Sequence, residues 1–326
     1  MNFNLSDDQR MLKDSLDRLV AEPVTGAAIN ELGLYMLPFD EADGGLGLGA
    51  VEMMLVGEAF GKALVVEPYL GGVVLAGTAL RLAPASPERA DAITALASGE
   101  KRFAAITAQG ADMVLGGDSA DMFVHIDGDA VALVDAAAIS RRSFRLHNGW
   151  GAASILLEGP GSVALGHVPG STAKLEQQAI AWLSANAVGA MDAAFALTVD
   201  YLKTREQFGK PIGSNQALQH RVAEMLVELE AARSMAIYAT QMIDEPDADE
   251  RGRAFAAIKL VINKAARFIG QQVVQLHGGI GVAQEHDAGR YFKHLTVIEM
   301  LFGDSDHHAD RLARLDGFTR ASPHWS

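Results

Sequence analysis

The sequence predicts a mainly helical protein with a small β domain in its middle. Apolar residues follow helical spacing through roughly the first hundred residues. Between residues 103 and 172, short apolar runs alternate with Gly, Asp and Pro, a pattern typical of strands and turns. From residue 175 onward, long helical patterns are joined by short loops, as in an antiparallel bundle. We therefore predict an N-terminal helical domain (1–102), a small β domain (103–174) and a C-terminal four-helix bundle (175–326).

The N-terminal segment opens with a helix start signal. Ser6 and Gln9 have the spacing of a capping box, in which each side chain bonds to a backbone amide of the first turn. Apolar residues at helical spacing follow, up to Val20. A glycine-rich turn at 43–49 precedes two further expected helices, at about 50–62 and 73–82.

The middle segment contains short apolar runs that predict strands, and the bundle segment contains long helical patterns. The expected strands cover Met113–Leu115, Met122–Ile126, Ala130–Val134, Ser154–Leu157 and Val163–Leu165. The expected bundle helices cover 178–205, 215–244, 251–277 and 288–302, with a last helix near 305–315. An acidic loop at 244–250 separates two of the long helices.

Charge and composition exclude several classes of function. The 326 residues include 27 basic and 41 acidic side chains, a net charge of −14, which opposes non-specific binding to nucleic acid or to anionic lipid. The chain has no cysteine, so disulfides, Cys-based zinc sites and thiol catalysis are excluded. The polar start, Met1–Arg10, does not resemble a signal peptide, and we expect a cytoplasmic protein. The apolar stretch Ala179–Leu202 contains polar residues and predicts a buried bundle helix rather than a membrane span.

Two stretches of the C-terminal segment carry a family resemblance. The first is Arg205-Glu206-Gln207-Phe208-Gly209-Lys210-Pro211-Ile212, followed by Gln216 and Gln219, which resembles the acyl-CoA dehydrogenase pattern R-x-Q-F-G-x-P-I-x-x-x-Q-x-x-Q. The second is Gln275-Leu276-His277-Gly278-Gly279-Ile280-Gly281, which is similar to the family's Q-x-x-G-G-x-G. A weaker match runs from Gly33-Leu34 to Gly44-Gly45-Leu46-Gly47, with two extra residues after the Pro.

The resemblance implies an acyl-CoA dehydrogenase fold, FAD as cofactor and an acyl-CoA as substrate. It further implies a dimer or tetramer and an electron-transfer flavoprotein or similar electron acceptor. The residues expected to bind FAD are Arg205, Phe208, Gln216, Gln275, Gly278 and Gly279. In the family, the Arg and the Phe reach the FAD of a neighbouring subunit.

Elementary chemistry agrees with these roles. An Arg side chain can bind a pyrophosphate with two charge-assisted hydrogen bonds. Glycines without a Cβ let backbone amides approach a phosphate. Taken singly, Arg205 also suits the C-terminal end of a helix dipole, and Gly278 also suits a helix C-cap. The joint occurrence of both motifs, about seventy residues apart, favours the cofactor role. We expect no metal site, because the adjacent His307 and His308 diverge on a helix and no H-E-x-x-H is present.

The sequence departs from the family at the catalytic base. Most members carry a Glu in a segment resembling I-Y-E-G-T, where this chain has Phe302. A minority carry the Glu near the start of the helix before R-x-Q-F-G, and ungapped counting places Ala179 there. Asp304 is a possible substitute, but we favour a helix N-cap for it. Glu299 is expected to be a solvated carboxylate. The catalytic residue of this chain is therefore unknown.

The middle segment departs as well. It lacks segments similar to T-E-x-x-A-G-S-D and W-I-T-N, which line the flavin ring in the family, and at roughly seventy residues it is short. This combination resembles one subunit of the heteromeric α2β2 acyl-CoA dehydrogenases, in which a partner supplies the base. Two alternatives stay open: a self-sufficient homo-oligomer that uses Asp304, and a non-catalytic scaffold that binds acyl-CoA or a partner.

Overall fold

The chain divides into two compact units. Unit 1 contains residues 1–55 and 65–182, and unit 2 contains residues 56–64 and 183–326. The computed structural model describes residues 5–107, 111–158, 161–283 and 286–315. The predicted fold class is confirmed, because helices precede and follow a middle segment that holds the strands of two sheets. The division into three domains at 102 and 174 stays a prediction.

The N-terminal helices begin where their cap residues predict. The capping box is confirmed: Ser6 and Gln9 exchange side-chain bonds with each other's backbone amides at the start of α1. Arg89 of α5 makes a two-bond contact with Asp43, with N···O distances of 3.0 and 2.8 Å, and so fixes the turn at 43–49. The α-helices are α1 (Asp7–Leu19), α2 (Gly26–Glu31), α3 (Ala50–Lys62), α4 (Gly77–Leu82) and α5 (Pro87–Ala97).

The helix expected at 73–82 differs from the structure. A π-helix, η2, occupies Leu70–Ala76 and continues into α4. Every residue of η2 is buried, and its glycines lie against strands: a Cβ at Gly71 would lie 2.1 Å from the Leu115 carbonyl oxygen. The apolar run in the sequence predicted a helix there, but the period of such a run does not distinguish π turns from α turns.

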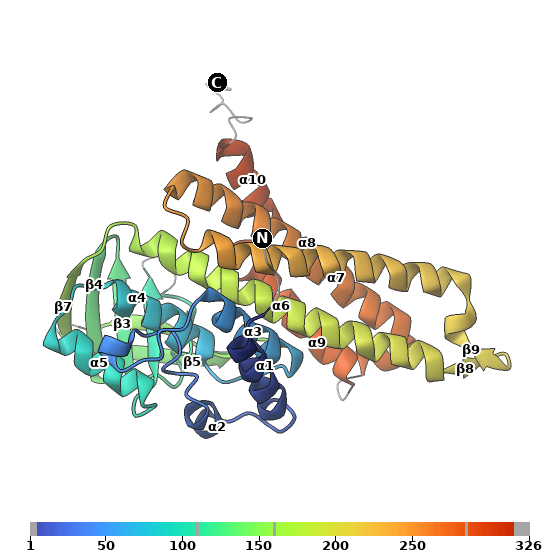
Figure 1. Cartoon of the computed structure of the whole chain (residues 1–326), viewed down its shortest axis with the longest axis horizontal. Coiled ribbons are helices and arrows are strands. Elements are labelled where there is room, and N and C mark those ends of the chain that lie inside the picture. Colours follow the sequence, from blue (N-terminus) through green and yellow to red (C-terminus); the bar gives the residue numbers. More distant parts are fainter. Residues whose placement is uncertain (1–4, 108–110, 159–160, 284–285, 316–326) are drawn as a thin grey trace. The chain divides into compact units, whose positions relative to one another are not determined.

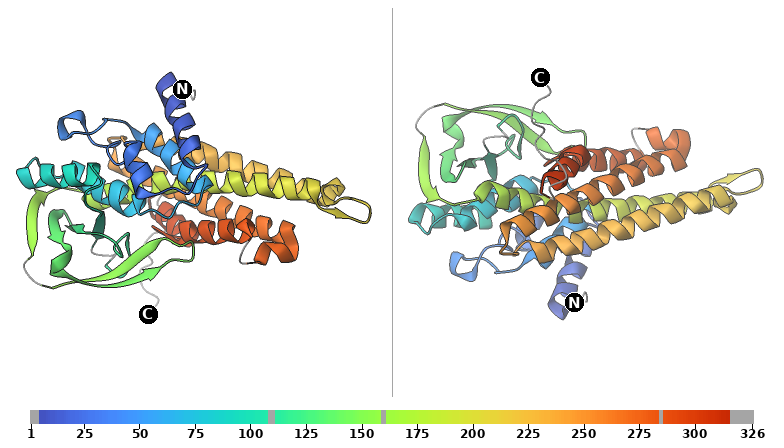
Figure 2. Two further views of the ribbon diagram at one scale, coloured as in Figure 1. Left: turned by 90° about the horizontal axis from the view of Figure 1, so that it is seen from below. Right: turned by 90° about the horizontal axis from the view of Figure 1, so that it is seen from above.

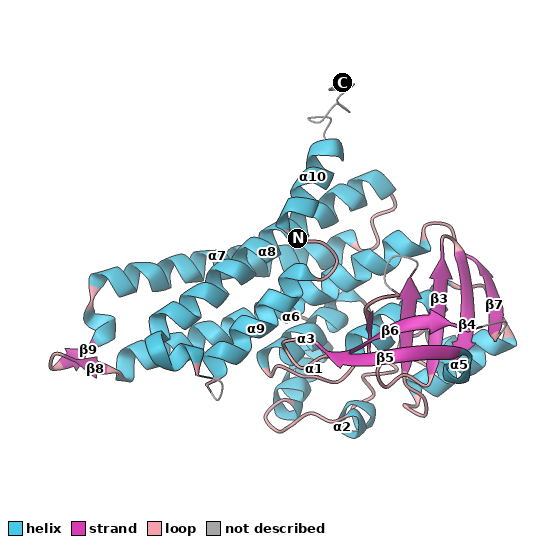
Figure 3. Cartoon of the chain, turned by 180° about the vertical axis from the view of Figure 1, so that it is seen from behind, coloured by secondary structure: helices cyan, strands magenta, loops and turns pink. Residues whose placement is uncertain are grey.

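Two sheets form the β part of unit 1 (Figure 3). One has the order β1-β3-β4-β7 and the other β2-β6-β5; β1 and β3 are parallel and the remaining pairs antiparallel. Their shared core includes Ile106, Val114, Phe123 and Val134. The strands are β1 (Phe103–Thr107), β2 (Val114–Leu115), β3 (Met122–Asp127), β4 (Ala130–Asp135), β5 (Ile139–Arg145), β6 (Gly151–Leu157) and β7 (Ser162–His167).

The sequence analysis missed β1 and β5. Four of the five β1 residues are buried, so the strand has no alternation of apolar and polar residues. The opposite holds for β5, in which five of seven residues are exposed, including Arg141 and Arg142, so that it contains no apolar run.

Unit 2 contains the helical bundle (Figures 1 and 2). The helix α8 packs against α7, α9 and α10, and Arg233 of α7 pairs with Asp192 of α6 at 2.9 Å. A small hairpin, β8 (Glu206–Gln207) and β9 (Lys210–Pro211), joins α6 to α7. The helices are α6 (Ser171–Thr204), whose residues 171–182 belong to unit 1, and α7 (Gln216–Met242), α8 (Ala248–His277), α9 (Asp287–Met300) and α10 (Ser305–Leu315). The sequence predicted α6 from 178, because Lys174, Glu176 and Gln177 obscure the apolar pattern of its first turns.

The helix α6 is long and apolar enough to cross a membrane, but 67% of its most apolar window is buried inside the protein. This agrees with the predicted core helix. The apolar positions of Trp182–Leu202 also predict a subunit interface, and that stays a prediction. Ala187, Met191 and Ala194 are fully buried within the chain, whereas Phe195, Leu197 and Val199 keep part of their surface exposed.

Candidate functional site

The hairpin after α6 presents the first predicted group of residues. Phe208 and Gly209 form its two-residue turn, with φ values of 53° and 77°, as a type I′ turn requires. A positive φ is uncommon for a residue with a side chain, and here it places Phe208 in full contact with solvent. The amide of Ile212 donates to the Arg205 carbonyl oxygen at 2.8 Å and closes the base of the hairpin. The Arg205 side chain is exposed and has no polar partner among the described residues.

The glycine loop after α8 presents the second group. Gly278, with a φ of 62°, is the C-cap of α8, as predicted. Gly278 and Gly279 begin the short helix η5 (Gly278–Val282), and both are exposed. A Cβ added to either residue would meet no atom within 4 Å, so open space surrounds this backbone. Gln275, on the last turn of α8, is exposed as well.

Two contacts bring the motifs to one end of the bundle. Tyr201, one turn before Arg205, stacks on His277 with ring centroids 4.5 Å apart, and its hydroxyl donates to the His277 carbonyl oxygen at 3.4 Å. Arg221 of α7 donates to Gln272 of α8 at 2.8 Å. Gln216 is the first residue of α7, so it lies at the same end, beside the hairpin (Figure 1). All six residues predicted to bind the cofactor therefore lie at this end of unit 2.

His277 is a further candidate for a polar contact at the glycine loop, and the sequence analysis did not single it out. Its Nδ1 lies 2.8 Å from the Val273 carbonyl oxygen and must carry the proton, which leaves Nε2 as an acceptor in the neutral ring. Burial lowers the pKa of His277 and favours that neutral form. Nε2 is buried and has no hydrogen-bond partner in the described part of the chain. The position of His277 directly before Gly278 and Gly279 is the sequence feature that could have identified it.

The loop between α9 and α10 contains the position where the family carries its base. Phe302 has a φ of 56°, and Gly303 follows with 97°. Asp304 is the N-cap of α10, as predicted: the His307 amide donates to its carboxylate at 2.9 Å. This hydrogen bond lowers the pKa of Asp304. The other position for a base, Ala179, is a fully buried apolar residue.

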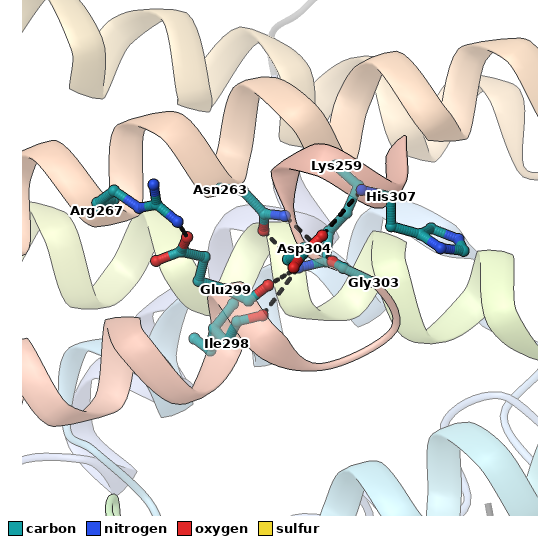
Figure 4. Close-up of polar contacts among 8 residues, drawn as sticks. All are labelled: Lys259, Asn263, Arg267, Ile298, Glu299, Gly303, Asp304 and His307. Carbon is teal, nitrogen blue, oxygen red and sulfur yellow. Dashed lines mark hydrogen bonds and ion pairs between the residues drawn. The ribbon is translucent and has the colours of Figure 1, made fainter. Parts of the chain in front are cut away.

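Side chains of α8 (Figure 4) and His308 of α10 hold the backbone of this loop. Lys259 of α8 is fully buried, and its ammonium donates to Asn263 and to the carbonyl oxygens of Ile298 and Glu299, the last two at 2.8 and 3.3 Å. Asn263 donates to the Gly303 carbonyl oxygen at 3.2 Å, and His308 lies 2.8 Å from that of Phe302. These bonds fix the α9 end and the loop on the bundle.

The expectation that Glu299 is a solvated carboxylate is wrong. Its side chain is only 8% exposed and forms an ion pair with Arg267 of α8 (Figure 4). Glu299 and Asp304 are thus both engaged in structural contacts. Within the described ranges, no group of three or more acidic or histidine side chains is placed to hold a metal ion.

Comparisons with known proteins agree with the motifs. Residues 174–315 match the acyl-CoA dehydrogenase C-terminal domain. The chain is 34% identical to acyl-CoA dehydrogenase IpdE2 of Mycobacterium tuberculosis over 317 residues, which cover 88% of this chain and 90% of the relative. Its fold matches a chain of the ChsE4-ChsE5 complex from Mycobacterium tuberculosis with a TM-score of 0.84 and 22% identity, over 98% of this chain and all of that one. It also matches PigA with FAD and proline, with a TM-score of 0.85 and 20% identity, over 97% and 99% of the two chains. The extent and identity of the match to IpdE2 show that the chain belongs to the acyl-CoA dehydrogenase family of oxidoreductases.

Proposed function

We propose that this chain is an acyl-CoA dehydrogenase subunit that completes the FAD site of a second, base-bearing family member. The pair would introduce a double bond between the α- and β-carbons of an acyl-CoA and pass the electrons to an electron-transfer flavoprotein or similar acceptor. The observation that carries the proposal is the contrast within unit 2. At one end, the Arg205 guanidinium and the open backbone at Gly278 and Gly279 are available to FAD. At the base position, the carboxylates of Glu299 and Asp304 are engaged in an ion pair and a helix cap.

The residues at the hairpin end fit an anionic dinucleotide. The exposed Arg205 guanidinium is available to a pyrophosphate, and an Arg binds such a group bidentately. The open space around Gly278 and Gly279 leaves room for a phosphate or ribose to approach the backbone. Gln216 and Gln275 would supply amide groups to the adenosine part. A structure named for its FAD is among the folds that match, which supports the choice of cofactor.

FAD, when bound, supplies the hydride acceptor of the desaturation. The residues of this chain bind and orient it from one side only. Phe208 is suited to cover part of the cofactor, because its ring stands free on a strained turn that gives it no contact within its own hairpin.

The proton chemistry requires a group that this chain does not offer at 302 or 179. An acyl α-proton is weakly acidic, so a carboxylate must lie within hydrogen-bond reach of it. Asp304 caps α10, and the hydrogen bond that holds it lowers its basicity. Phe302 accepts no proton. A carboxylate from a partner supplies the missing base. A matching chain belongs to the ChsE4-ChsE5 complex, whose two components have different names, and this supports a heteromer.

The apolar surface at the hairpin end suits an interface with that partner. Ile280 and Val282 of the glycine loop are 47% and 72% exposed, and Phe208 is fully exposed. Large apolar side chains gathered beside polar ligand groups are typical of binding surfaces. They lie on the hairpin and on η5.

Co-purification with a base-bearing acyl-CoA dehydrogenase family member from the same genome tests the proposal. We expect the chain alone to retain little flavin and the complex to be a yellow tetramer that desaturates acyl-CoA. In the complex, Asp304→Asn keeps a good N-cap and removes the carboxylate, so flavin reduction after anaerobic mixing with acyl-CoA should keep most of its rate. Glu→Gln at the partner's base should abolish it. A flavin-saturated, active homo-oligomer of this chain, slowed by several orders of magnitude in Asp304→Asn, would establish the self-sufficient alternative. If neither the chain alone nor the complex contains flavin, the non-catalytic scaffold alternative is supported.

A further inference from the structure

A pocket of about 330 Å3 lies in unit 1. The six residues assigned to FAD belong to unit 2. Its volume is within the range of small-molecule sites. Three structural elements and the start of β1 surround it: α2, the π-helix η2 and the end of α5. The residues used in the argument are Asn30, Tyr35, Gly72, Gly99, Lys101 and Arg102.

Four polar side chains of the pocket have no hydrogen-bond or ion-pair partner among the residues that the structure describes. Neither the Tyr35 hydroxyl nor the Asn30 amide forms a hydrogen bond to any described residue, and the Lys101 and Arg102 side chains form no ion pair there. Arg102 is close enough to Tyr35 to favour ionisation of its phenol, but burial and Glu67 outweigh it and raise the pKa of Tyr35. The hydroxyl therefore remains a donor at neutral pH. Four unpartnered polar side chains thus meet at one hollow.

The charge of the lining is opposite to that of the chain. The protein has a net charge of −14, yet the charged residues of the lining are Lys101 and Arg102; the Glu67 carboxylate stands beside Gly26, with its Oε2 3.5 Å from a Cβ placed there. Pro68, Val73, Leu96 and Phe103 supply an apolar wall. A ligand that satisfies both features has an apolar body and an anionic head. A bare phosphate would leave the apolar wall in contact with water.

Glycines keep the pocket open. A Cβ at Gly26 would lie 3.2 Å from the Tyr35 hydroxyl oxygen, and a Cβ at Gly99 would lie 3.3 Å from the Tyr35 ring and from Asn30. The φ of 69° at Gly99 also favours glycine. Gly72 comes from the fully buried π-helix, and π turns inside helices often occur at functional sites.

We propose that this pocket binds an amphipathic organic carboxylate, with its head at Lys101, Arg102 and Tyr35 and its apolar body against Val73, Leu96 and Phe103. The site and its ligand are independent of the proposed FAD role, because none of the six residues assigned to FAD lines the pocket.

Isothermal titration calorimetry of the full-length chain, or of its complex if the chain requires its partner, tests the site with octanoate as the probe. We expect saturable binding of one octanoate per chain. Acetate, inorganic phosphate and octan-1-ol should each bind at least about tenfold more weakly, since each lacks the head or the body. The double variant Lys101→Met/Arg102→Met should lose about tenfold or more in octanoate affinity, and Tyr35→Phe a smaller factor.

The matched control is Lys174→Met/Arg142→Met, which removes one lysine and one arginine of the same unit that do not line the pocket. It should bind octanoate like the unmodified chain. Equal affinity in the Lys101/Arg102 and control variants, or no binding of octanoate at millimolar concentration, overturns the proposal. Tighter binding of octyl phosphate than of octanoate overturns the assignment to carboxylates. Neither measurement depends on flavin or on turnover.

Discussion

Replacing the buried Lys259 with Met removes three hydrogen bonds, two to carbonyl oxygens at the end of α9 and one to Asn263 of α8. The carbonyl oxygens of Ile298 and Glu299 lie in the last turn of that helix, where no amide of the same helix reaches them. Without the ammonium, these oxygens and that of Asn263 lose their partner in a buried environment. Each orphaned group costs about 1–3 kcal/mol, and removing one partner from a buried charged network typically costs about 3–5 kcal/mol. We expect a loss of that size in the free energy of unfolding.

The pH dependence of stability gives a second signature of Lys259. Burial, partly offset by Glu299 and Asp304, lowers the pKa of Lys259 to about 7 from an ordinary value of 10.5. Between these values the unfolded chain binds a proton that the folded chain has released. The free energy of unfolding from this group therefore rises with pH across that window, by at most about 1.4 kcal/mol per pH unit, and is lowest below pH 7. Lys259→Met should lack this rise.

Urea unfolding from pH 6 to 10 measures both effects, with Lys264→Met as the control. Lys264 is on the same helix, but its side chain is 74% exposed and its ion pair with Glu228 is 3.7 Å long. Its loss should cost less than about 1 kcal/mol and leave the pH slope unchanged. Hydrogen exchange should accelerate at the amides of 301–304 in Lys259→Met only. If the two variants unfold at the same urea concentration with the same pH slope, Lys259 does not hold the loop.

Three further predictions concern the motif end and the loop. Arg205→Ala should weaken FAD binding to the complex about ten- to a hundredfold, because it removes a hydrogen bond to a charged group. The melting curve of the apo protein should hardly change, since the side chain is exposed and has no partner among the described residues. Wild-type affinity in a flavin titration, or an equal loss of affinity in Lys203→Ala, contradicts the pyrophosphate role. Asp304→Ala should lower the melting temperature and Asp304→Asn should not, because Asn also caps a helix; identical melting of the two variants removes the capping argument. Gly278→Ala should destabilise the end of α8 by about 1 kcal/mol through its positive φ, measured by urea unfolding, although open space surrounds the new methyl group; an unchanged midpoint contradicts this.

Local signals in the sequence predicted most of the helical framework. The capping box at Ser6 and the Gly278 cap mark helix ends through interactions within a few residues, so both were predictable. The hairpin end was predictable for a different reason. The two motifs stand at the ends of two long neighbouring helices of one bundle, and the alternation of helix direction brings those ends together. The missed strands β1 and β5 lack the alternation of apolar and polar residues that marks a half-buried strand.

The environment of the base position could not be predicted in the same way, because it depends on burial set by tertiary packing. Lys259 follows Phe255 by four residues and precedes Ile262 by three, within the buried stripe of α8. A lysine is usually exposed, so the pattern alone favours solvent for it. Its burial makes it the cap of α9, and together with Asn263 and His308 it holds the carbonyl oxygens of residues 298, 299, 302 and 303. The same packing brings Glu299 into contact with Arg267, and no local pattern in the sequence predicts this ion pair. Hydrogen bonds thus fix the backbone of the loop at the position where the family carries its base, while Asp304 caps a helix and Glu299 forms an ion pair. This arrangement favours a subunit that binds the cofactor and leaves proton abstraction to a partner.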